Sequence, residues 1–407
     1  MEQEEVWILR IKPSQPAEWE KARVVLLCQP SIETLFAILE TNSANFLFPF
    51  DLRKAVEEHR NFRRKLEEFG AKVYDLREML ISGCFDSPLE ENIKRLREFA
   101  LNSVKYSFDK GISAEDREFL LKNLRKTIEV LSPDVLADII ILRPVINISY
   151  NPHALDPTTR FLSSYCVEPA NNLYFMRDGM LTTREGIVIG NFTLDVRKIE
   201  NDIVDLALRQ MGIEPILRVR EPGHAEGGDF MPAGDFVLQG QGLLTDENGV
   251  NQMLEHGVYG NVEVGIVMDP NPAMEEMHLD TYFNFLGKSI ALLSEDRMKE
   301  GKEPIVEVYE PVAESRVKYI KKYRTTLRKY LEDKGFEIFP ISLEEQRNFA
   351  PNFLLLEDRR LIGVAQAGQD FAERLKKWNI RAELLDFSAL TGGYGGPHCM
   401  SQVIVRG

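Results

Sequence analysis

A cysteine close to the C-terminal end of the chain lies in an unusual setting. The stretch "GGYGGPHCMSQ" (392–402) places Cys399 after His398 and four glycines. Structural cysteines more often lie inside apolar runs, as Cys28 does in "VVLLCQP". Glycine lets the backbone adopt conformations that other residues avoid, so this cysteine is predicted to lie on a loop. A thiol next to a cation or a base can become a nucleophilic thiolate, which makes Cys399 a candidate nucleophile.

Three more polar clusters precede this cysteine along the chain. They are "NNLYFMRD" (171–178), "HAEGGDF" (224–230) and "HLDTYF" (278–283). Each is weak alone, because "EGGD" suits a plain turn and a lone histidine such as His59 or His256 is more often structural. The glycines of "GGYGG" lack the following GK[ST] of a phosphate-binding loop.

Together the four clusters supply a thiol, a histidine and several carboxylates. A histidine can pass a proton to a leaving group, and carboxylates can orient that histidine or hold a cation. A guanidinium is planar and cationic, and it pairs with two carboxylates at once. The set therefore suits a positively charged guanidino substrate better than a peptide carbonyl. The motifs lack metal-ligand spacing, so we expect neither a metal nor an organic cofactor.

The composition limits the partners of the chain. Its 407 residues carry 64 acidic and 50 basic side chains, a net charge of −14, which argues against nucleic-acid and acidic-membrane partners. No apolar run is long enough to span a membrane, and the acidic N-terminus does not resemble a secretory signal. The four cysteines lie far apart, which disfavours a disulfide scaffold. We expect a cytoplasmic protein that binds a small molecule, and whether it forms a homo-oligomer stays open.

Alternating elements predict an α/β fold. Residues 22–30 read as a buried strand, 51–70 as a helix that stops at Gly70, and 71–76 as a second strand. Residues 85–150 read as nearly all helix, with serine caps before several segments. After residue 160 strands predominate, and helices are expected at 343–349 and 370–378. This layout is compatible with repeated ββαβ units, although the pattern does not prove them.

The ordered motifs resemble those of the arginine deiminases, members of the guanidino-group-modifying superfamily. "NLYFMRD", "EGGD", "HLDT" and "GGPHCMS" match that family in order and in separation, and "ARVVLLCQP" and "AVEEHRNF" match its beginning. The resemblance covers nearly the whole chain. It implies a five-bladed α/β propeller of the pentein type, with the active site in a central channel. Residues 1–80 and 156–407 would form the catalytic domain, and residues 81–155 a helical insertion.

The resemblance also implies roles for single residues. Cys399 would attack the guanidinium carbon, His278 would act as general acid and base, and attack would expel ammonia and leave an amidino-thioether that water hydrolyses. The other expected site residues are Glu226 (pairing with substrate and histidine), Asp178 and Asp280 (gripping the guanidinium), Phe175 (packing beside the substrate) and Asn172 (holding its far end).

We expect other residues in the motifs to have structural rather than catalytic roles. We expect His398 to be structural rather than the base, and Gly227 and Gly228 to permit close backbone approach. Arg177 and Asp229 fit salt-bridge partners within their loops. The remaining cysteines, Cys28, Cys84 and Cys166, are expected to be structural.

The chain departs from the family at the substrate's carboxylate end. Of the arginines that hold the α-carboxylate in the family, only Arg197 in "DVRKIE" matches, whereas Leu244 and Tyr394 occupy the places of two others. A charge-assisted contact is worth roughly 1.5–3 kcal/mol. The sequence therefore predicts a high KM for free arginine, or a preference for a carboxylate-free guanidine such as agmatine.

Several functions share this set of residues. The first is a hydrolase of arginine deiminase type, which makes a ureido product (citrulline from arginine) and ammonia. The second is an amidinotransferase, in which an amine replaces water. A catalytically idle binding protein would be free to lose a member of the set, and an unrelated α/β enzyme would need four coincidences in order.

Overall fold

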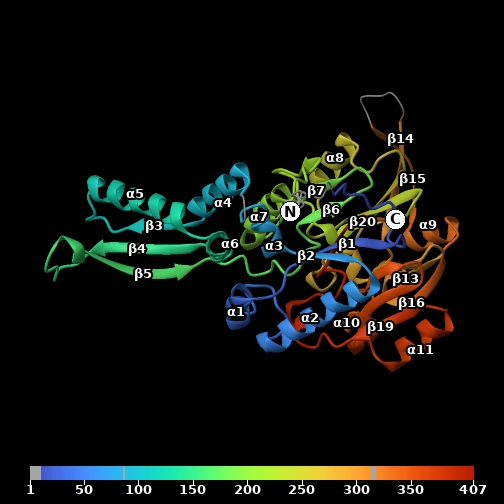
Figure 1. The fold of residues 1–407 in the computed structure, drawn as a ribbon. Helices are drawn as coiled ribbons and strands as arrows, with labels where there is room; N and C mark the ends of the chain where they lie inside the picture. The colour runs from blue at the N-terminus through green and yellow to red at the C-terminus, as the bar shows by residue number, and fades with distance from the viewer. Residues whose placement is uncertain (1–10, 86–87, 313–317) are drawn as a thin grey trace, which may run out of the picture.

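Five small β-sheets built on one plan make up the body of the molecule (Figure 1). The computed structural model describes residues 11–85, 88–312 and 318–407. In each sheet a first strand pairs antiparallel with a second, and the second pairs parallel with a third. A helix lies between the second and third strands in sequence, as a parallel connection requires. The ββαβ repeat that the sequence only suggested is thus present five times.

The first two units are β6 (Met180–Thr182), β7 (Ile187–Ile189), α7 (Lys198–Gln210) and β8 (Leu217–Arg218), then β9 (Phe230–Pro232), β10 (Phe236–Gln241), α8 (Glu247–His256) and β11 (Glu263–Met268). The next two are β12 (Phe283–Gly287), β13 (Ile290–Ser294), α9 (Leu327–Asp333) and β16 (Glu337–Ile341), then β17 (Leu354–Glu357), β18 (Arg360–Val364), α11 (Gln369–Lys377) and β19 (Arg381–Leu385). A hairpin of β14 (Ile305–Pro311) and β15 (Tyr319–Thr326) extends the β9–β11 sheet.

The fifth unit joins the two ends of the chain. The C-terminal strand β20 (Gln402–Arg406) pairs antiparallel with β1 (Ala22–Leu27), which pairs parallel with β2 (Lys72–Asp75) after α2 (Leu52–Phe69). The last part of the chain therefore completes the unit that the first part begins. The described residues form no closed sheet, and the propeller arrangement of the five units stays a prediction.

Local sequence explains the limits of α2. The side chain of Asp51 accepts hydrogen bonds from the backbone N–H groups of Arg53 and Lys54 at the helix start. Gly70 ends the helix with φ of 96°, a left-handed conformation that glycine adopts without strain. The buried face includes Phe62 and Leu66, as the helical spacing in the sequence predicts.

The segment between α3 and β6 protrudes from the body (Figure 1). It contains α4 (Glu90–Ser103), β3 (Lys105–Phe108), α5 (Ala114–Val130), α6 (Pro133–Leu142), β4 (Pro144–Tyr150) and β5 (Phe161–Val167). The prediction that residues 85–150 are nearly all helix is wrong at β3 and β4, which form a three-stranded sheet with β5. The strands "PVINISY" and "FLSSYCV" are rich in β-branched and aromatic residues, which favour strands. Because β5 ends at Val167, this unit extends past the predicted limit at residue 155.

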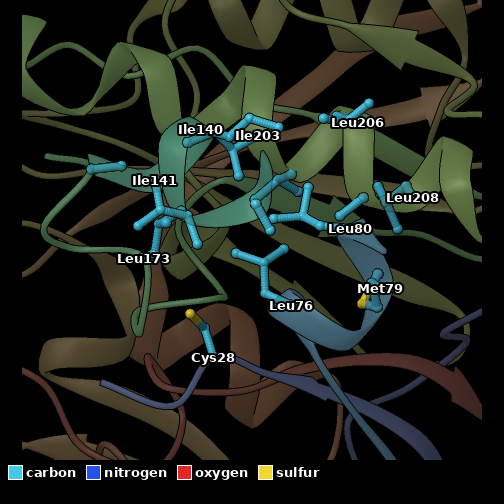
Figure 2. Packing of buried hydrophobic residues seen from close by; sticks show 14 of the residues in the cluster. Cys28, Leu76, Met79, Leu80, Ile140, Ile141, Leu173, Ile203, Leu206 and Leu208 are labelled. Carbon is cyan, nitrogen blue, oxygen red and sulfur yellow. The ribbon is translucent and has the colours of Figure 1, made fainter. Parts of the chain in front are cut away.

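An apolar cluster fastens the root of the protrusion to the body. Figure 2 shows Ile140 and Ile141 of α6 in one cluster with Leu76 and Leu80 of α3 (Leu76–Leu80). Side chains of α7 and Cys28 belong to the same cluster, so Cys28 is a core residue, as the sequence predicted. The remaining helices are α1 (Ile32–Leu39) and α10 (Leu343–Arg347). None of the helices among the described residues is both long and apolar enough to cross a lipid bilayer.

Candidate active site

The predicted catalytic residues all lie immediately before the first strand of a ββαβ unit. Asp178 precedes β6, Glu226 precedes β9, His278 and Asp280 precede β12, and Cys399 precedes β20. The segments before the first strands of several units therefore bring their side chains together at one place. All five side chains are at least nine-tenths buried.

A small cavity of about 30 Å³ lies where these positions meet. It is lined by Ala44, Asn45, Asn172, Phe175, Asp178, Arg197, Met277, His278, Thr281, Gly393, Tyr394 and Cys399. Of the predicted substrate-binding residues, Leu244 alone is not among this lining. Leu244 is buried, and its backbone carbonyl accepts a hydrogen bond from Thr193.

Cys399 is held by an amide and a carboxylate. Its Sγ lies 3.0 Å from Nδ2 of Asn352 and 3.4 Å from Oδ2 of Asp280. Burial raises the pKa of the Cys399 thiol well above its usual value, and the charges of Asp280 and Asp178 raise it further. The activation by a neighbouring cation or base that the sequence suggested is therefore not what the described residues show, because carboxylates rather than cations lie beside the thiol.

Asn352 is the site residue that the motif comparison missed. Its Oδ1 accepts hydrogen bonds from the backbone N–H groups of Gly396 and Cys399, while its Nδ2 reaches the sulfur. It lies immediately before β17, the first strand of the fourth unit, so the repeat itself is the signal that could have found it. Asn352 therefore fixes both the loop and the side chain of the nucleophile.

His278 forms a buried pair with Glu226. Nε2 of His278 lies 3.1 Å from Oε2 of Glu226. Burial alone would lower the pKa of His278, but the hydrogen bond to Glu226 and the carboxylates of Asp229 and Asp178 outweigh it and raise that pKa to about 10. His278 is thus a protonated acid at neutral pH. A Cβ on Gly228 would lie 2.6 Å from its ring, so this position needs glycine.

The second histidine of the site belongs to a layer behind the nucleophile. His398 is fully buried, with Nδ1 2.7 Å from Oδ2 of Asp280. Burial works to raise the pKa of Asp280, but the hydrogen bond and charge of His398 lower it overall. Arg177 donates to the carbonyl of His398 and lies 3.6 Å from Glu18. Both residues hold the Cys399 loop in place. The acidic partner of Arg177 is Glu18 rather than a residue of its own loop, so the salt bridge predicted within that loop is not what the structure shows.

Asp229 supports the neighbouring motif. Its Oδ1 accepts a hydrogen bond of 2.9 Å from the backbone N–H of Leu279, which fixes the "HLD" segment. Burial raises the pKa of Asp229 to about 6. No basic side chain of the described residues forms a salt bridge with Asp229, so the salt bridge predicted within its loop is not what the structure shows.

Arg197 forms ion pairs with two carboxylates. Its Nη1 lies 2.8 Å from Oδ2 of Asp178, and its Nε lies 2.9 Å from Oε2 of Glu200. Burial raises the pKa of Asp178 in spite of this pairing. Nη2 of Arg197 is buried and has no hydrogen-bond partner among the described residues. Asn172 lies next to this pair, with its backbone N–H on Glu200 and its side-chain amide on Ala44.

Three carboxylate oxygens of the site are also without partners. Oδ1 of Asp178, Oδ1 of Asp280 and Oε1 of Glu226 are buried, and no described residue donates a hydrogen bond to them. Buried acceptors are normally satisfied, so a ligand with several N–H donors would complete this site. A guanidinium has that donor set. No group of three or more side chains suited to a metal ion occurs in the described parts of the chain.

The family model of arginine deiminase matches residues 46–406. The chain belongs to the arginine deiminase family. The arginine deiminase of Halobacterium salinarum is 23% identical, over 97% of both chains, and that of Limosilactobacillus reuteri is 26% identical, over 86% of this chain and 87% of its own. The protein is a guanidino-group hydrolase, as its motifs predicted.

Solved structures share the fold at low identity. DDAH (dimethylarginine dimethylaminohydrolase) from Pseudomonas aeruginosa, solved with citrulline, is 15% identical with a TM-score of 0.54, and covers 94% of this chain and 98% of its own. The amidinotransferase SxtG from Microseira wollei is 14% identical with a TM-score of 0.56, over 97% of both chains. The N-terminal domain of the arginine dihydrolase ArgZ, bound to product, has a TM-score of 0.56 at 11% identity, over 94% of this chain and 97% of that chain.

Proposed function

We propose that the protein converts a guanidino substrate to the ureido product and ammonia through a covalent intermediate on Cys399. The observation that carries this proposal is the set of three unpartnered buried carboxylate oxygens of Asp178, Asp280 and Glu226. Asp178 lines the same cavity as Cys399 and His278, while Asp280 contacts the sulfur of Cys399 and Glu226 contacts the ring of His278. A planar cation with N–H donors on several edges is the ligand class that satisfies all three.

The substrate's charge supplies the activation that the empty site lacks. Burial, together with the charges of Asp280 and Asp178, raises the pKa of the Cys399 thiol and so disfavours the thiolate before binding, because a thiolate would add another negative charge to a buried acidic site. A bound guanidinium replaces that repulsion with attraction, so the Cys399 proton leaves to solvent when the substrate binds. The enzyme thereby avoids exposing a reactive thiolate when no substrate is present.

The reaction then follows from the geometry. The thiolate attacks the guanidinium carbon, His278 donates its proton to one terminal nitrogen, and the C–N bond breaks to release ammonia. Glu226 stabilises the protonated form of His278 before this step. Neutral His278 next takes a proton from water as the water attacks the amidino carbon. The C–S bond breaks, and the ureido product leaves with the second proton lost to solvent.

An amidinotransferase is the second candidate, because that reaction would use the same thiol, histidine and carboxylates. There the C–N bond to the substrate's tail breaks instead, and an amine accepts the amidino group. The test is incubation with arginine, followed by analysis for citrulline and ammonia against ornithine and an amidinated amine. We expect citrulline and ammonia, and we expect Cys399→Ala to form neither. Ornithine formation that depends on an added amine would contradict hydrolysis, and turnover by Cys399→Ala would contradict the mechanism.

A further inference from the structure

A second, larger chamber adjoins the catalytic cavity. Its volume is about 610 Å³, within the range of roughly 300–1,000 Å³ typical of small-molecule sites. Thr281 and Tyr394 line both spaces, and Asn352, which contacts the sulfur of Cys399, lies in the chamber wall. The catalytic cavity of about 30 Å³ has room for little more than a small polar head. A guanidino substrate whose head fills this cavity can extend its tail past Tyr394 into the adjoining chamber.

Most charged groups in the chamber wall are already paired. Glu276 accepts a hydrogen bond of 2.6 Å from Gln346 and pairs with Arg297, and Lys302 lies 2.6 Å from Asp296. Two charges remain. Arg347, at the end of α10, and Glu275 form no ion pair or side-chain hydrogen bond with the described residues. One free cation and one free anion thus face the same space.

The chamber wall also contains two strained aromatic residues. Phe349 has φ of 62° and Tyr394 has φ of 82°, a left-handed conformation that bulky side chains rarely adopt. Their rings contact each other edge to face, with centroids 6.3 Å apart. Backbone strain of this kind costs of order 1–3 kcal/mol and clusters at ligand sites. Phe349 follows closely after Arg347 in sequence, so the strained segment also sets the position of that cation.

The charges lie close enough to Tyr394 to influence it. Burial and, to a smaller extent, the charges of Glu275 and Glu276 raise the pKa of the Tyr394 hydroxyl to about 12, and the charge of Arg347 opposes them. Tyr394 stands between the two spaces, so groups that act on it lie along the path of a substrate tail.

We propose that this chamber binds the α-amino acid end of the substrate, with Arg347 facing the α-carboxylate and Glu275 facing the α-ammonium group. The inference rests on the proposed guanidino hydrolysis and adds the substrate class. It opposes the prediction drawn from Leu244 and Tyr394, because it supplies an anchor from a part of the chain outside the family motifs. Arg347 and Glu275 are specificity-determining residues, and neither touches the reacting atoms.

Four guanidines separate the two contacts. Arginine has both end groups, δ-guanidinovalerate has only the carboxylate, argininamide has only the ammonium, and agmatine has neither. We expect Arg347→Ala to lower kcat/KM about 10-fold for arginine and δ-guanidinovalerate, chiefly through KM, because an exposed charge pair is worth less than a buried one. Argininamide and agmatine should be unaffected. Glu275→Gln should instead lower kcat/KM for arginine and argininamide.

Two control variants complete the design. Arg347→Lys keeps the charge and should retain most of the activity with arginine, and Arg64→Ala, on the exposed face of α2, should change nothing. Equal losses with all four guanidines, or none, in Arg347→Ala would overturn this inference while the hydrolysis itself stands. Failure of the parent enzyme to hydrolyse any guanidine would overturn the proposed function, and this inference with it.

Discussion

The two ends of the substrate path are built differently. At the reacting end, the functional groups lie before the first strands of successive units and are almost completely buried. At the tail end, Arg347 and Glu275 lie on a short helix and a turn, and both are exposed. Buried groups on a repeated framework fix the chemistry, whereas exposed groups on connecting segments are free to vary with the substrate. Leu244 and Tyr394, which occupy the places of two family arginines, belong to the predicted tail end. A substitution at that end leaves the reacting groups unchanged.

This comparison predicts the largest effects at the reacting end. Asp178→Asn and Asp280→Asn keep the size of each side chain and remove the charge that we assign to guanidinium binding. Breaking one side of a buried charge pair costs about 3–5 kcal/mol, so we expect kcat/KM to fall by about 10²- to 10³-fold. Steady-state ammonia release measures this effect. Asp195→Asn, at an exposed site, is the matched control, and parental activity in either buried variant would refute the pairing.

Asn352 should give a smaller loss of a different kind. Asn352→Asp keeps an oxygen for the N–H groups of Gly396 and Cys399 but replaces the amide that faces the sulfur. The added negative charge next to the thiol should raise the pKa of Cys399, so the activity should fall about 10- to 100-fold and its rise with pH should move to higher pH. The pH profile of kcat separates this from a loss of fold. A lower kcat whose pH profile is unchanged would contradict the predicted rise in the pKa of Cys399.

The pair of His278 and Glu226 predicts a stability effect that depends on pH. The pKa of His278 is about 10 in the fold and about 6.5 in an unfolded chain. Its stabilising proton is therefore fully bound below about pH 6.5 and is lost as the pH rises through about 10. Glu226→Gln should lower the Tm more at pH 6.5 than at pH 10.5. A Tm difference that stays constant or grows with pH would refute this, and Glu247→Gln serves as the exposed control.

Thiol labelling tests the smallest effect that we predict from the comparison of the two ends. In the enzyme without substrate, iodoacetamide should modify Cys166 before Cys399, because Cys166 is exposed and Cys399 is buried with a raised pKa. This reverses the order that a thiol with a lowered pKa would give. Peptide mapping over time measures the order. Faster labelling of Cys399 would show that the empty site already holds a thiolate.

The sequence predicted the reacting end well for a physical reason. Cys399, His278 and Glu226 lie in short motifs whose residue types carry the chemistry, and Gly228 is required because His278 lies against its backbone. Asn352 was missed because an isolated asparagine before a strand has no chemical signature of its own. Its position becomes visible only when the ββαβ units are superimposed.

The fold was predicted in outline, with a clear failure in the protrusion. The helix at 51–70 was predicted to stop at Gly70, and the structure confirms this; its N-terminal cap, Asp51, also lies in the local sequence. The strands β3 and β4 were read as part of a helical segment, since a strand depends on partners that are distant in sequence. The raised pKa of Cys399 could not be foreseen either, because it depends on carboxylates of other units.

The mass of the covalent adduct tests the central claim most directly. We predict that acid-quenched turnover with arginine leaves a peptide containing Cys399 that is heavier by the mass of the substrate less ammonia. The same peptide from Cys399→Ala should carry nothing. A gain equal to the bare amidino group would show that the substrate's tail leaves first, as in an amidinotransferase. An unmodified Cys399 during rapid turnover, with trapping verified on a known thioether-forming enzyme, would contradict covalent catalysis altogether.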